Sequence, residues 1–217
     1  MKVQTIDNTR NNSYNPNFGV IKLKLKGHLK SSDFLKKQCA ERLEETVQAL
    51  PEYKLADKAI GNREATLTLG AEDYIYALPQ DKGFQNRHGY TMNIRLEYDN
   101  VEEKGKKWVP KFLKRIWYGD ERVVAKYRMK YSDEFTLREV TDSVVNDIKQ
   151  GKGVPEKDGT KPLINKIGTF RNSLEHFRLE VLKLTNPKKY DEASNQRAQE
   201  IADFWKSVYK KKQDGVS

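Results

Sequence analysis

Lysine and arginine concentrate in one stretch of this sequence, residues 104–130, together with bulky aromatic side chains. The stretch holds ten Lys or Arg and two acidic residues, so it contributes +8 to a total net charge of +10. Cations neutralise phosphates and aromatic faces stack on bases, so this combination is typical of surfaces that bind nucleic acid. Because the aromatics are interleaved with the cations, the pattern favours single-stranded DNA or RNA over a duplex.

The candidate binding residues of this stretch fall on a short helix, a turn and a strand. Helical spacing places Trp108, Phe112 and Ile116 on the side opposite most of the cations, which predicts that these three pack in the core. On the strand, cations alternate with inward-facing residues and recur about every 7 Å, a spacing that can follow a sugar–phosphate backbone. The predicted nucleic-acid-binding residues, with Trp117 and Tyr118 as stacking platforms, are Lys107, Lys111, Lys114, Arg115, Trp117, Tyr118, Arg122, Lys126, Arg128 and Lys130.

A second row of cations lies near the N-terminus, where Lys22, Lys24 and Lys26 alternate with apolar residues. The period of two predicts a half-buried strand. If this strand and the strand at 122–131 belong to one sheet, that sheet has an apolar face for helices and a cationic face for a polyanion. The alternative is that these lysines only protect an exposed strand from edge-to-edge aggregation.

Residues for catalysis are sparse. His28, His88 and His176 are far apart in the sequence and form no metal-binding or catalytic spacing. The acidic residues between Glu97 and Glu103, next to Lys104, have the chemistry to hold Mg²⁺ for phosphodiester cleavage, although a solvated acidic turn explains them equally. We therefore predict no catalytic residue, metal or cofactor, and keep a metal-dependent nuclease as an alternative.

Two further partners fit the basic amphipathic helix. Such a helix can lie on an anionic membrane, but its shortness and the adjoining strand favour packing into a domain. The cations can also dock an acidic protein. No apolar run is long enough for a membrane span.

The elements around these residues predict an α+β fold. We expect a polar flexible arm at 1–18 and a mostly antiparallel sheet with one early helix at 19–131. Residues 83–89 read as a loop, because Gly83 and Gly89 enclose a polar segment. A helical portion at 132–217 follows, includes a long helical hairpin, and forms either a separate unit or one continuous domain with the sheet.

Residues 163–184 carry the most regular pattern in the chain. Apolar residues from Leu163 to Leu184 recur at alternating spacings of four and three, as in a coiled-coil seam. Phe170 and Phe177 are bulky for a two-stranded coil, so packing on the sheet is favoured, with self-association through this helix as the alternative.

Composition completes the prediction. Cys39 is the only cysteine, and the N-terminal segment has no apolar core typical of a signal peptide, so we expect a cytoplasmic protein. The favoured function is largely sequence-independent binding of nucleic acid. A structural subunit of the coat or nucleoprotein type is the second hypothesis, because the polar arm, the heptad helix and the basic stretch all suit it.

Overall fold

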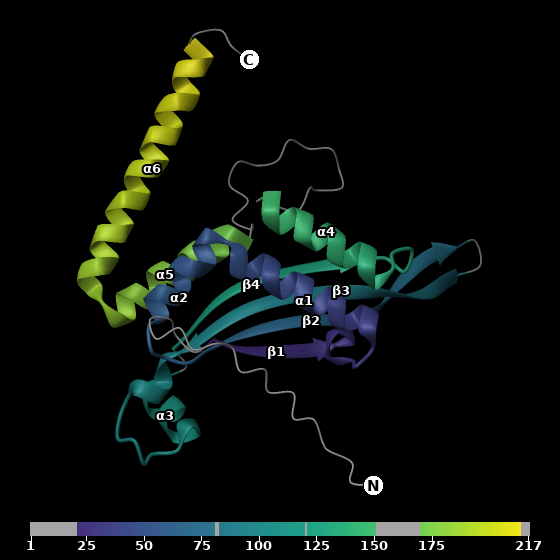
Figure 1. Cartoon of the computed structure of the whole chain (residues 1–217), viewed down its shortest axis with the longest axis horizontal. Helices are drawn as coiled ribbons and strands as arrows, with labels where there is room; N and C mark the ends of the chain where they lie inside the picture. The colour runs from purple at the N-terminus through teal and green to yellow at the C-terminus, as the bar shows by residue number, and fades with distance from the viewer. Residues whose placement is uncertain (1–20, 81–82, 120, 151–169, 214–217) are drawn as a thin grey trace.

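The fold is that of a computed structural model, which describes residues 21–80, 83–119, 121–150 and 170–213. It confirms the α+β class: one four-stranded sheet carries helices on one face (Figure 1). The arm expected at 1–18 lies outside the described residues.

The sheet has the strand order β1-β2-β3-β4 and is mostly antiparallel. Only β1 and β2 run parallel, while β2–β3 and β3–β4 are antiparallel pairs. The two cationic strands predicted from the sequence therefore form the two edges of one sheet. The strands are β1 (Ile21–Gly27), β2 (Ala65–Gln80), β3 (Gly83–Asp99) and β4 (Arg122–Tyr131).

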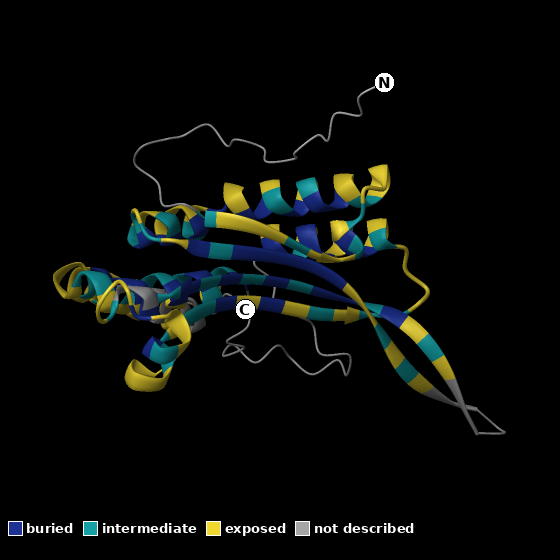
Figure 2. Cartoon of the chain, turned by 90° about the horizontal axis from the view of Figure 1, so that it is seen from below, coloured by how far each residue is buried: buried dark blue, intermediate teal, exposed yellow. Residues whose placement is uncertain are grey.

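The loop predicted at 83–89 is wrong, because β2 and β3 pair along their whole length as one long hairpin. The glycine at position 89 belongs to the strand, since a Cβ there would lie 2.2 Å from the carbonyl oxygen of Tyr131. Gly89 thus permits a close approach of β4 and marks no turn. Beyond this point the hairpin projects past its neighbours as a two-stranded ribbon (Figure 2).

Four helices cover one face of the sheet, and the early helical segment is a pair of helices where one was expected. Pro51 ends the first helix and occupies the first position of the next, where its missing N–H costs nothing. The covering helices are α1 (Phe34–Ala49), α2 (Pro51–Ile60), α4 (Leu137–Gln150) and α5 (Phe170–Thr185). The short 3₁₀ segments are η1 (His28–Lys30) and η2 (Asn100–Glu103), and the other helices are α3 (Lys111–Tyr118) and α6 (Pro187–Gln213).

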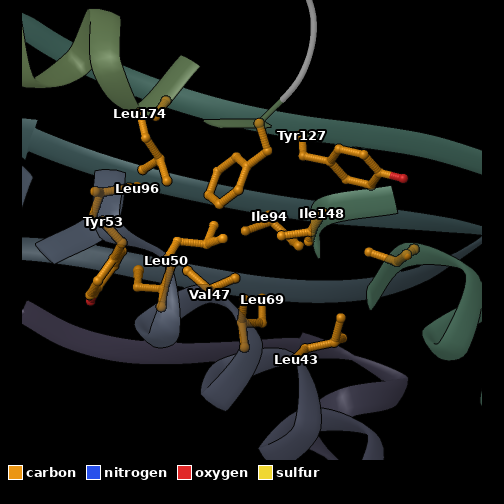
Figure 3. Close-up of a cluster of buried hydrophobic side chains, with 14 of the residues drawn as sticks. Leu43, Val47, Leu50, Tyr53, Leu69, Ile94, Leu96, Tyr127, Ile148 and Leu174 are labelled. Atoms are coloured by element: carbon orange, nitrogen blue, oxygen red, sulfur yellow. The ribbon is translucent and has the colours of Figure 1, made fainter. Parts of the chain in front are cut away.

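The core lies between these four helices and the inward residues of the sheet (Figure 3). Leu69 of β2 and Ile94 of β3 are fully buried, as are Leu43 of α1 and Leu174 of α5. The cysteine at position 39 is also buried.

The heptad pattern packs inside the subunit over its described part. Phe170, Leu174, Phe177 and Val181 are all buried against the sheet and α2. Positions 163 and 167 of the pattern lie outside the described residues. After α5 the chain turns at Asn186 and α6 extends away from the sheet (Figure 1). Within the described residues, no helix has an apolar stretch that would cross a lipid bilayer.

Candidate polyanion-binding face

Two neighbouring rows of residues cross the sheet on the face opposite the four helices. They are defined by strand pairing and hold five cations and no acidic residue. The first row is Lys24, Thr68, Arg95 and Lys126, and the second is Lys26, Gly70, Asn93 and Arg128. We call these eight residues the cationic rows.

The shape of this face follows from the sizes of the side chains. The four edge cations are exposed, whereas the residues between them are short, apart from Arg95. The two edge strands lie about 14 Å apart, three strand spacings. Long cationic side chains therefore flank a lower floor of threonine, glycine and asparagine that runs along β2 and β3. Such a surface can hold one extended polyanionic chain between two lines of positive charge.

Arg95 was not among the candidates from the sequence. It lies in the middle of the first row, and its Nε is 3.2 Å from Oε2 of Glu97. The signal was available, because Arg95 alternates with the inward residues Ile94 and Leu96 and therefore had to lie on the opposite face.

Several predicted cations are instead held by acidic residues. Lys111 and Arg115 of α3 both contact Asp99 at the end of β3, with the Lys111 nitrogen 3.2 Å from the carboxylate. Arg122 binds Glu97 at 3.1 Å. Lys104, in the same basic stretch, pairs with Glu121. The net charge of residues 104–130 thus overstates the charge that this stretch offers to a partner.

At the β1 edge, Lys22 binds Glu64 at 2.7 Å, and both side chains are more than half exposed. On β4, the Lys130 nitrogen lies 5.1 Å from the centre of the Tyr74 ring, a cation–π contact. Lys24, Lys26, Lys126 and Arg128 make no ion pair with any residue that the structure describes.

Helix α3 is oriented opposite to the prediction. Trp108, Phe112 and Ile116 are 77%, 63% and 72% exposed, whereas Lys114 is only 4% exposed. The physical reason is that the polar side of the helix has partners on the body, since Asp99 lies on the same face of β3 as Arg95. Burial removes Lys114 from any surface that a phosphate can reach. Trp117, Tyr118 and Lys107 are exposed, as the stacking and phosphate-contact hypotheses require.

The Asp99 carboxylate fixes α3 to the sheet. Burial raises the pKa of Asp99, but hydrogen bonds from Arg115 and Lys111 outweigh that effect and hold the pKa below its ordinary value of 3.8. Its side chain is 15% exposed, so water screens these contacts little. The pair therefore stabilises the fold above pH 3.8, and this contribution is lost as the pH falls through the lower folded-state pKa.

We expect Asp99→Asn to lower the free energy of unfolding at pH 7 by about 2 kcal/mol, the usual loss for hydrogen bonds to a charged group. In urea unfolding, the difference from the parent should shrink as the pH falls below 3.8 toward full protonation of Asp99. Glu64→Gln, which breaks the exposed pair with Lys22, is the matched control and should leave the urea midpoint unchanged. A loss that persists undiminished at acidic pH would show that the carboxylate charge is not what holds α3.

The acidic residues proposed as a metal site have other roles here. Glu97 and Asp99 are bound by arginine and lysine, and the side chains of Glu102 and Glu103 lie outside the described residues. Across the described ranges, no group of three or more His, Cys, Asp or Glu side chains is placed to hold a metal ion.

Comparison of the chain with protein-family models, with curated proteins and with solved structures finds no match. The function therefore has to be argued from the geometry alone.

Proposed function

We propose that this protein binds single-stranded nucleic acid, largely without reading its sequence, along the cationic rows of the sheet. The observation that supports the proposal is the alignment of Lys24 and Lys26 on one edge strand with Lys126 and Arg128 on the other, on one face and in two adjacent rows. Neighbouring cations on each strand lie about 7 Å apart, close to the spacing of successive phosphates in an extended strand.

A single strand suits this face better than a duplex. The flanking cations are about 14 Å apart, whereas a double helix is wider and would rest on them without reaching the floor. Exposed aromatic side chains, Trp117 and Tyr118, lie on α3, at the end of the same face where Asp99 binds that helix. A strand that follows the floor toward β3's last residues approaches these aromatic rings, which can stack on its bases.

The proposal is tested by an electrophoretic shift assay with single- and double-stranded DNA and RNA at two salt concentrations. We expect single strands to shift at lower protein concentration than duplexes. Contact with four or five phosphates implies a slope of about −3 for the logarithm of the binding constant against the logarithm of salt concentration. Binding that is absent at low salt, or that does not respond to salt, would contradict the proposal.

A further inference from the structure

Helix α3 carries a contiguous exposed apolar surface, which we call the α3 cluster. A large apolar patch on the surface of a soluble protein marks an interaction site, because exposing it to water is unfavourable. The cluster consists of Trp108, Phe112, Ile116, Trp117 and Tyr118, which are 77%, 63%, 72%, 61% and 44% exposed.

The fold holds this cluster outward. On the opposite side of α3, Arg115 and Lys111 bind Asp99 and Lys114 is buried. Turning the helix to bury its aromatic residues would break these ion pairs and bring charged groups to the surface in their place. A Cβ at Gly105 would lie 2.9 Å from the Tyr118 ring, so this residue also packs closely on the loop that precedes the helix. The exposure is therefore built into the way α3 is attached.

The charges around the cluster favour a protein partner over an anionic lipid or nucleic acid. A membrane-binding helix carries uncompensated lysines and arginines beside its apolar side. Here Asp99 compensates Lys111 and Arg115, and Glu121 compensates Lys104, so the exposed cations Lys106 and Lys107 are at one end of the cluster only. Tryptophan and tyrosine are also the residues that contribute most to protein–protein contacts.

The size of the cluster fits a contact between two copies of this chain. Aromatic side chains bury about 150–250 Å² each, which gives an exposed cluster of roughly 600 Å². Two such clusters facing one another bury about 1,200 Å², above the roughly 1,000 Å² that a specific interface needs. Helix α3 stands apart from the helices that cover the other face, at one end of the sheet (Figure 1), so two copies can bring these helices together.

We propose that the α3 cluster is the contact surface of a two-fold symmetric dimer of this chain. In a two-fold contact, residue i of one copy touches residue j of the other, and j touches i. Two α3 helices packed antiparallel across the axis bring Phe112 of each copy near Ile116 of the other. This inference is independent of nucleic-acid binding, because it uses a different surface and apolar contacts in place of charge.

The test is sedimentation of the full chain between about 1 and 100 μM, with two variants whose new charges suit their ends of α3. Phe112→Asp places a negative charge near the helix N-terminus and Ile116→Lys a positive charge near the C-terminus, so both should fold. We expect the parent to dimerise and each variant to associate about thirtyfold more weakly. Ile75→Asp, at a 65% exposed position on the β2–β3 hairpin, is the control and should dimerise like the parent.

Salt and mixing make the outcome specific. Dimerisation of chains that each carry +10 should strengthen with salt, because repulsion is screened, whereas binding to a polyanion weakens. An equimolar mixture of Phe112→Asp and Ile116→Lys should recover association, since the two introduced charges face each other in the mixed dimer. A parent that stays monomeric at high salt, or variants that lose binding to anionic vesicles or oligonucleotides but not self-association, would overturn the inference. So would a mixture that remains monomeric, because it excludes the antiparallel two-fold contact.

Discussion

Replacing Lys126, Arg128 and Lys130 with glutamate is expected to weaken oligonucleotide binding at least about hundredfold at low salt. All three side chains are exposed on β4, two of them in the cationic rows, so the change converts one side of the floor from attraction to repulsion. Each lost phosphate contact should also reduce the salt slope, by about two in total for three contacts on a single strand. The measurement is a titration of a labelled single strand at several salt concentrations.

The fold should survive this triple substitution. The inward residues of β4, Ala125 and Tyr127, are unchanged, and the backbone N–H of Lys126 still donates to the Ser173 hydroxyl at 2.9 Å. A matched control reverses three exposed lysines of the covering helices, Lys54, Lys58 and Lys183, and changes the net charge by the same amount. If the two triple variants lose affinity equally, the effect is one of overall charge and the cationic rows are not the site.

The sheet could be predicted from the sequence because alternation in a strand is a local property. Inward and outward residues of β4 were assigned correctly from the period of two, and the same reasoning would have placed Arg95 on the outer face. Which strands form the edges, and that the rows of β1 and β4 align, depends on contacts between residues far apart in sequence. Gly89 misled the prediction for the same reason, since its role is set by Tyr131.

Helix α3 shows why the candidate site could be predicted only in part. Its amphipathic pattern identifies two sides but does not say which one faces the body, and the usual assumption is that the apolar side does. Asp99, twelve residues before Lys111, decides the question by binding the cationic side. The same ion pairs remove Lys111, Arg115 and Arg122 from the charge offered to a partner, and no count of charges along the sequence reveals that.

Phe177→Ala is expected to lower the free energy of unfolding by about 3–5 kcal/mol, the largest loss from any single substitution considered for this chain. The ring is 1% exposed and lies in the core between α5 and the sheet, so truncation removes its transfer energy and leaves a cavity. For a chain of this length, the melting temperature should fall by roughly 10 °C. Urea and thermal unfolding followed by circular dichroism measure both changes.

Leu184→Ala is the control that separates a core from a seam between subunits. Leu184 continues the heptad pattern of Phe177 on the same helix, but it is 40% exposed. In a coiled-coil dimer both residues would lie in the interface, and both substitutions would weaken self-association. Because α5 packs inside the subunit, Phe177→Ala should destabilise the fold at every protein concentration, and Leu184→Ala should have an effect below about 1 kcal/mol. Comparable losses from both changes, growing at low protein concentration, would instead place this helix between two subunits and remove the need for the contact through α3.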